Sequence, residues 1–289
     1  MEKHMIKIIK YFFEASFVYF FFIFSKIIGL NLSRKIFSKI FVQIGPLIKK
    51  KTIIYKNLDK LPTQLSDQSK ERLIKDMWSN YGMTFIEYFF LRKFRNENFH
   101  MKIKGEKILD EIYSNKKVVI FISGHFANYE LMAMELTKKK IKLATIYRPL
   151  NNFFLNPFVE HIRKKFICKN QIKKGRMGVK DTINFINQEH SIALMIDQRV
   201  SEGEKIEFFN SKAFTSTLPA QLALKYNLDI VPIHIERKNN NLFEMEVFKP
   251  LDIKKYKSKL EISKKLNQLL EEMIIRNPNQ WIWTHNRWK

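Results

Sequence analysis

The segment Ser123–Glu130, SGHFANYE, combines residue types suited to acid–base chemistry. It follows a short apolar run and precedes a segment with helical spacing, and in α/β sheets such strand-to-helix loops commonly carry functional groups. If His125 lies on the turn before the helix and Glu130 in its first turns, the carboxylate can approach the imidazole. It would then fix the tautomer and stabilise the imidazolium that forms when a proton is taken up. We therefore predict a His125–Glu130 acid–base pair.

The type of reaction is narrowed by motifs that the sequence lacks. There is no G-x-S-x-G nucleophile elbow, no P-loop and no dinucleotide fingerprint. A base without a protein nucleophile suits deprotonation of a substrate hydroxyl that then attacks an acyl carbonyl, which is worth about 10²–10⁴-fold in rate. On these residues alone, a helix-capping histidine and a surface glutamate remain an alternative.

The elements that would position this loop alternate between strand and helix. Apolar residues at three- and four-residue steps predict helices, and short apolar runs predict buried strands. The pattern favours a single α/β domain around a mixed, largely buried β-sheet flanked by helices. The expected helices are 64–93, 131–138, 153–165, 177–188, 217–226 and 258–276, and the expected strands are 117–123, 141–147, 192–196, 230–236 and 242–248, with a turn at 238–241.

The N-terminus differs from the rest of the chain. Residues 11–32 read YFFEASFVYFFFIFSKIIGLNL, and lysines and arginines lie on both sides. A membrane-spanning helix needs about 20 mostly apolar residues, and the aromatic density and basic flanks suit a bilayer. We expect residues 1–45 to form a membrane anchor with its basic flank and residues 46–289 to form the catalytic domain. An interfacial helix and a buried core helix are the alternatives.

Composition narrows the function classes. The only cysteine is Cys168, so no intrachain disulfide and no cysteine-based zinc site is possible, and the histidines lack metal-ligand spacing. The 52 Lys and Arg against 28 Asp and Glu give a net charge of +24, which favours anionic partners. With 14% aromatic residues, a non-catalytic basic module on a membrane or on nucleic acid is a second hypothesis. The dispersed charges and the absence of an RRM or KH signature count against nucleic acid.

Several blocks in order resemble one known family. Gly124–Glu130 resembles the H-x4-D/E block of the lysophospholipid acyltransferase superfamily, in the form found in the lipid A biosynthesis (lauroyl/myristoyl) late acyltransferases. The later blocks that are similar to this family are Tyr147-Arg148-Pro149 with Asn152, Arg163, Lys174-Gly175-Arg176, Asp197-Gln198, Phe208-Phe209 with Ala213-Phe214-Thr215, and the C-terminal W-x-W-x-H-x-R-W-K from Trp281 to Lys289. Tyr129, Asn156 and Asn210 depart from the residues that are usual in the family at these positions.

The resemblance implies site residues. His125 would be the general base and Glu130 its orienting partner, with Arg163 and Asp197 as further catalytic residues. Asp197 follows an expected strand, where it would order Arg199 or the His125 loop or serve structure alone. Backbone amides at the start of the helix after His125 would offer oxyanion donors. The substrate-binding residues would be Arg148, Asn128 and Arg176, and no metal is expected.

The resemblance also implies a fold, a reaction and a location. The fold would be like that of glycerol-3-phosphate acyltransferase. A fatty acyl chain would pass from an acyl carrier protein thioester to a hydroxyl of a Kdo-containing lipid A precursor, with no cofactor. The expected partners are the carrier protein, the lipid and the bacterial inner membrane, with the catalytic domain on the cytoplasmic face. Acylation of another membrane lipid, such as a lysophospholipid, an aminolipid or a glycolipid, is the alternative.

Overall fold

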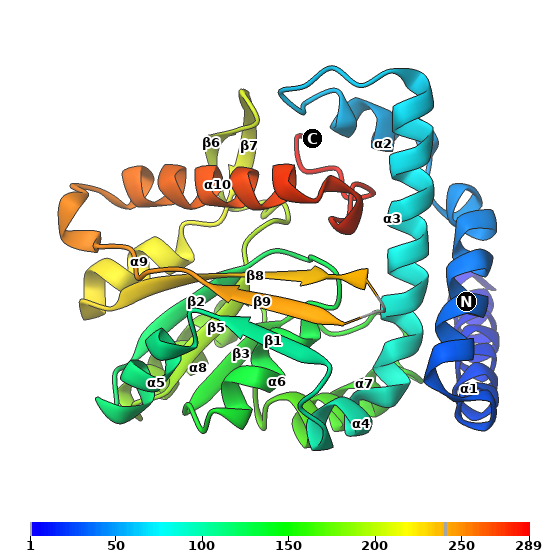
Figure 1. Ribbon diagram of the computed structural model, residues 1–289, viewed down its shortest axis with the longest axis horizontal. Coiled ribbons are helices and arrows are strands. Elements are labelled where there is room, and N and C mark those ends of the chain that lie inside the picture. Colours follow the sequence, from blue (N-terminus) through cyan, green and yellow to red (C-terminus); the bar gives the residue numbers. More distant parts are fainter. Residues whose placement is uncertain (1, 240–241) are drawn as a thin grey trace.

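A seven-stranded mixed sheet forms the centre of the protein (Figure 1). The computed structural model describes residues 2–239 and 242–289. The strand order is β1-β9-β8-β2-β5-β3-β4, and neighbours are parallel except for β8 and β9. The bounds are β1 Met101–Lys104, β2 Val119–Ser123, β3 Leu143–Tyr147, β4 Asn170–Lys173, β5 Ser191–Met195, β8 Asp229–Arg237 and β9 Phe243–Val247. The expected α/β fold is confirmed.

Helices cover both faces of this sheet. α9 (Leu218–Tyr226) and α10 (Lys259–Arg276) lie on one face, and α5 (Glu106–Ser114) and α6 (Glu130–Lys138) lie on the other (Figure 1). α8 (Arg176–Asn187) contributes Ile186 to the same apolar cluster as α10. Ile120 of β2 faces that cluster, whereas Phe121 faces the cluster that includes Leu131 of α6. A central parallel strand is buried on both faces, which explains its unbroken apolar sequence.

The expected helices and strands with strong patterns are all present. The helix expected at 153–165 comprises α7 (Asn156–Ile162) and a following π-helical turn, Arg163–Ile167. Of the expected turn at 238–241, residues 240 and 241 lie outside the described residues. Sequence patterns did not predict α2 (Lys51–Leu58), the part of α4 (Leu91–Asn96) after residue 93, α5, the edge strands β1 and β4, or the hairpin of β6 (Glu204–Phe208) and β7 (Ser211–Thr215).

α1 (Glu2–Ile48) is bent at Gly29, where φ is 77° and ψ is 169°. This left-handed conformation suits glycine, because it has no Cβ to clash. Past the bend, residues 30–48 pack along α3 (Asp67–Glu87). Gly82 of α3 allows this close approach, since a Cβ there would collide with the backbone carbonyl of Phe37. The second part of α1 therefore belongs to the folded body.

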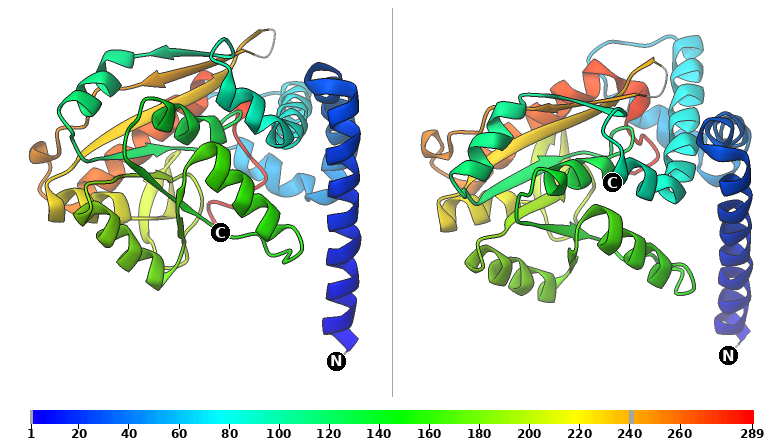
Figure 2. Two further views of the ribbon diagram at one scale, coloured as in Figure 1. Left: turned by 90° about the horizontal axis from the view of Figure 1, so that it is seen from below. Right: turned by 60° about the horizontal axis from the view of Figure 1, so that its bottom comes forward.

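The first part of α1 runs beside the body and extends past it (Figure 2). Phe12, Phe13, Phe17 and Phe20 are each more than half exposed. α1 is, in the part of the chain that the structure describes, the one helix long and apolar enough to cross a membrane. The boundary expected between residues 45 and 46 falls inside this helix, and the division into two domains stays a prediction.

Candidate active site

His125 and Asp197 come together because the strands before them are neighbours. β2 and β5 run parallel with Ser123 paired to Met195, and the N–H of Ile196 donates to the carbonyl of Ser123 at 2.9 Å. Each of the two functional residues lies two positions past that pair. They therefore meet at the carboxyl ends of the parallel strands, the edge at which open α/β sheets bind ligands.

The Asp197 carboxylate is hydrogen-bonded on both oxygens. Its Oδ1 lies 2.7 Å from Nδ1 of His125, and its Oδ2 accepts from the backbone N–H of His125 and from the indole N–H of Trp281, both at 2.9 Å. Asp197 is only 2% exposed, and a carboxylate buried this deeply needs such partners. Because Asp197 accepts, the neutral imidazole carries its proton on Nδ1, which leaves Nε2 as its basic nitrogen.

Burial and charge act in opposite directions on this pair. Burial alone would lower the pKa of His125, but the Asp197 carboxylate, its hydrogen bond and the charge of Glu130 raise this pKa overall. Burial would raise the pKa of Asp197, but the charge of His125 and the bonds from His125 and Trp281 lower it to about 2. Asp197 thus stays ionised at neutral pH and makes His125 more basic, as a general base requires.

The expectation that Glu130 orients His125 is corrected by the structure. Arg163, the first residue of the π-helical turn, donates from Nε to Oε1 of Glu130 at 3.0 Å and makes a second bond to the same oxygen. Both side chains are largely buried, and a buried guanidinium needs a carboxylate beside it. Arg163 therefore forms an ion pair with Glu130, and Asp197 contacts the imidazole from the end of the neighbouring strand. Glu130 still acts on His125 through its charge.

A cleft of about 350 Å³ opens beside this pair, and His125, Glu130 and Arg163 are part of its wall. α6, β3 and β5 supply an apolar lining that includes Met132, Ala133, Ile146, Ala193 and Leu194. Arg148, Lys174 and Arg199 add positive charge to the same cleft. The cleft can therefore hold a ligand with both an apolar chain and an anionic group.

Arg148 and Lys174 are brought close together by the pairing of the strands before them. Tyr147 pairs with Lys173 across β3 and β4, and the N–H of Lys174 donates to the carbonyl of Tyr147 at 2.8 Å. Lys174 and Arg148 thus follow paired positions. Burial and the charge of Arg148 lower the pKa of Lys174, so the two positive groups repel each other, and an anion between them would relieve that repulsion.

The remaining predicted binding residues have different positions. Arg148 lines the cleft as expected. Asn128 is 1% exposed and donates from Nδ2 to Oε2 of Glu87 at 2.9 Å, so it has a structural contact, and its substrate role stays a prediction. Arg176 is exposed at the start of α8 and outside the cleft lining, and its substrate role stays a prediction. The described residues contain no group of three or more His, Cys, Asp or Glu placed to hold a metal.

The C-terminal residues 281–289 take a part in the site that was not predicted from the sequence. Trp281 is buried at 1% exposure, and it also donates a hydrogen bond to Asp197. Nε2 of His285 accepts from the N–H of Arg199 at 2.9 Å, and Arg287 donates to the main chain of the same turn at 3.2 Å. The available signal was the presence of His285 and Arg287 among tryptophans, because core packing does not require polar residues there.

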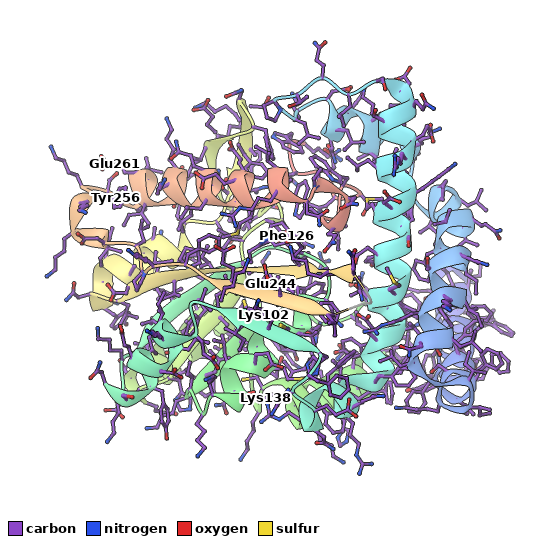
Figure 3. The ribbon with its side chains drawn as sticks, viewed as in Figure 1. Lys102, Phe126, Lys138, Glu244, Tyr256 and Glu261 are labelled. Atoms are coloured by element: carbon purple, nitrogen blue, oxygen red, sulfur yellow. The ribbon has the colours of Figure 1, made fainter. Side chains whose placement is uncertain are left out.

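A buried loop backs the site. Phe126, labelled in Figure 3, is fully buried in the loop between His125 and α6 and forms a β-bridge with Trp281. Its ring meets the ring of His234 edge to face at 4.8 Å between centroids. The N–H of Ala127 donates to the carbonyl of Gln280 at 3.0 Å. The loop that carries His125 is thus fixed on the side opposite the cleft.

A histidine hydrogen-bonded to a buried carboxylate, at the carboxyl edge of a mixed sheet and beside an apolar cleft with cations, is the arrangement expected of an α/β enzyme that uses acid–base chemistry. Comparison with known proteins identifies the family. The family model described as bacterial lipid A biosynthesis acyltransferase matches residues 2–289, and the chain belongs to this family. It is 24% identical over 238 residues to lipid A biosynthesis acyltransferase 2 of Shigella flexneri, which covers 78% of this chain and 74% of that protein. The chain is therefore an acyltransferase of lipid A synthesis, as the resemblance implied.

Proposed function

We propose that the protein is a membrane-associated O-acyltransferase that takes a fatty acyl chain from an acyl carrier protein thioester. The acceptor is the 3-hydroxyl of an acyl chain already present on a Kdo-containing lipid A precursor. The observation that carries this proposal is the His125–Asp197 pair in the wall of a cleft with an apolar lining and cationic side chains. The family membership supports lipid A as the acceptor class.

In this reaction Nε2 of His125 takes the proton of the acceptor hydroxyl as its oxygen attacks the thioester carbonyl carbon. The C–S bond breaks, the new ester C–O bond remains, and the proton passes to the departing sulfur to give a thiol. Asp197 keeps the ring in the tautomer with the proton on Nδ1 and stabilises the imidazolium. The acceptor oxygen is the nucleophile, so no covalent enzyme intermediate forms.

The other charged groups suit the two substrates. Arg163, held by Glu130 at the cleft, supplies a fixed positive charge beside the reacting atoms. Arg148 and Lys174 are suited to a phosphate, either in the phosphopantetheine arm of the carrier or on the glycolipid. The net charge of +24 favours encounter with an acidic carrier and with anionic lipid.

The first part of α1 supports membrane attachment. Its exposed phenylalanines would lie in the bilayer and keep the cleft close to a lipid acceptor. Side chains project outward all along this helix (Figure 3). We place the catalytic body on the cytoplasmic face of the inner membrane, where a soluble acyl carrier can reach it.

The experiment mixes purified full-length protein in detergent with radiolabelled acyl carrier protein thioester and a Kdo-containing lipid A precursor. Wild type should transfer label to the lipid, and His125→Ala, checked for folding by circular dichroism, should not. Equal transfer by both proteins would refute the base. Parallel reactions with a lysophospholipid and with an acceptor lacking Kdo separate the lipid classes, and salt-sensitive RNA binding without transfer would favour a non-catalytic module.

A further inference from the structure

His285 lies in the wall of the same cleft as His125. Its backbone carbonyl accepts from Nδ2 of Asn57 at 2.9 Å and from the N–H of Arg287 at 2.9 Å. The first of these bonds fixes the C-terminal segment to α2. The residue is thus held by its main chain, and it is part of the wall of the cleft that also contains the proposed base.

The ring of His285 has a defined tautomer. Its Nε2 accepts the N–H of Arg199 at 2.9 Å, so Nε2 carries no proton, and the neutral ring must carry its proton on Nδ1. Among the described residues, no hydrogen-bond partner faces Nδ1, and that atom is not among the buried polar atoms without a partner. Nδ1–H is therefore a donor without a partner in the described part of the chain, and neighbouring atoms do not seal it off.

The ring is also kept neutral. Burial lowers the pKa of His285, and the charges of Arg287 and His125 act in the same direction, against the opposite effect of Asp197. A neutral imidazole donates a hydrogen bond without competing with His125 for the proton of the acceptor hydroxyl.

The backbone donors nearest the base are already used. The N–H of His125 donates to Asp197, that of Phe126 to the carbonyl of Gly124, and that of Ala127 to the carbonyl of Gln280. The amide groups of these three residues are thus not available to a thioester oxygen. The oxyanion donors expected at the start of the helix after His125 lie further along the chain, and that expectation stays a prediction. Attack on a thioester places negative charge on the carbonyl oxygen, and donors aimed at that charge are among the largest contributions to catalysis.

We propose that His285 is a catalytic residue whose Nδ1–H donates a hydrogen bond to the thioester carbonyl oxygen as it becomes an oxyanion. His125 and His285 then have complementary tasks on one substrate pair: His125 removes the proton of the alcohol, and His285 stabilises the charge on the acyl group. The assignment rests on the proposed acyl transfer, because it needs a carbonyl in the cleft.

Two conservative variants separate this role from a structural one. In His285→Gln the side-chain oxygen can take the place of Nε2 and still accept from Arg199, but nothing donates from the position of Nδ1. In His285→Asn the amide N–H lies near the position of Nδ1, but the acceptor for Arg199 is lost. We expect kcat of His285→Gln to fall about 10²–10³-fold with KM little changed, and His285→Asn to stay within about 10-fold of wild type.

The reverse order, with Gln active and Asn inactive, would show that His285 only holds the Arg199 turn and would overturn the assignment. A wild-type kcat in His285→Gln would do the same. If the wild-type protein transfers no acyl label to any of the acceptors, both the proposed function and this inference are refuted. A second measurement does not depend on turnover: ¹⁵N NMR of protein labelled at histidine should show that His285 is protonated on Nδ1. The signal of His285 is assigned by its loss in His285→Gln. Protonation on Nε2 would contradict the inference.

Discussion

The two oxygens of Asp197 have different tasks. Oδ1 faces the imidazole, whereas Oδ2 is fixed by the backbone of His125 and by Trp281. Rotation of the carboxylate would break bonds on both sides at once, and bonds to a charged group are worth about 1.5–3 kcal/mol each. The base is thus aligned by a carboxylate that is itself held in place.

Replacement of this carboxylate by an amide should change both the rate and its pH dependence. His125 acts when it is unprotonated, so kcat/KM should rise with pH until it passes the raised pKa of His125. Asp197→Asn removes the negative charge, which should move this acid limb to lower pH and reduce the plateau about 10²–10⁴-fold. A pH profile of acyl transfer measures both effects.

Asp110→Asn is the matched control, because Asp110 is an exposed acid on α5. Its profile should coincide with that of wild type. An unchanged acid limb in Asp197→Asn would mean that another group sets the basicity of His125.

The sequence was sufficient to single out His125 but not the carboxylate that contacts its ring. His125 stood out by its place in a strand-to-helix loop, and Glu130 was preferred because it is close in sequence. The carboxylate that contacts the imidazole is 72 residues away, and its approach depends on β2 pairing with β5, which strand patterns alone do not specify. Arg163 was expected at the site, but its ion pair with Glu130 depends on where the turn after α7 places the arginine.

A buried ion cluster joins the elements around the site. Glu87 at the end of α3 is fully buried and accepts from Arg34 of α1 at 2.6 Å, from Arg237 of β8 at 3.0 Å and from Asn128 beside the His125 loop. Burial would raise the pKa of Glu87, but the two arginines lower it overall. One carboxylate thus connects the N-terminal helix, the sheet and the catalytic loop.

Glu87→Gln should be strongly destabilising, because it leaves two buried guanidinium groups without a counter-charge. Removing one partner of a buried ion pair costs about 3–5 kcal/mol. Urea unfolding followed by circular dichroism in detergent measures the change. Glu71→Gln, in an exposed pair with Lys51, should cost less than about 1 kcal/mol, and equal effects of the two variants would show that the cluster adds no stability.

The helices and strands that were not predicted have weak apolar sequence patterns, and the reason is physical. β1 (MKIK) and the hairpin strand β7 (SKAFT) lie at edges, where alternate residues are half-buried in β1 and buried in β7. Their one or two apolar side chains do not form a run, and pairing with a neighbour defines them instead. In contrast, β2 buries every residue and shows an unbroken apolar run, and α3 buries enough side chains to show a helical period.

At the scale of the whole molecule, the two parts of α1 differ in how much apolar surface they expose. Residues 30–48 belong to the body, whereas the part before Gly29 contacts the body on one side and leaves Phe12, Phe13, Phe17 and Phe20 more than half exposed. Large exposed apolar surfaces on one element mark an interaction site. The body, with its net positive charge, would lie against anionic headgroups.

Charged residues on the exposed part of α1 should release the protein from membranes. Phe13, Phe17 and Phe20 are 60–66% exposed, so Asp at these positions leaves the body intact. Each Asp costs about 2.5–3.5 kcal/mol at the centre of a membrane span, and the triple variant should move from the vesicle pellet to the supernatant on sedimentation.

Tyr113→Asp combined with Leu260→Asp is the control, because these residues are about half exposed on elements far from α1 (Figure 1). This variant should remain with the vesicles. Retention of the α1 triple variant in the pellet would rule out α1 as the membrane contact.

Because Ser123 pairs with Met195, the positions of His125 and Asp197 depend on the number of residues in β2 and β5. A one-residue deletion or insertion within β2 or β5 shifts the later residues of that strand by about 3.3 Å and turns each of their side chains to the opposite face. The base and its carboxylate would then separate although neither had been replaced. Tolerance to small gaps should therefore be lowest in these two buried strands.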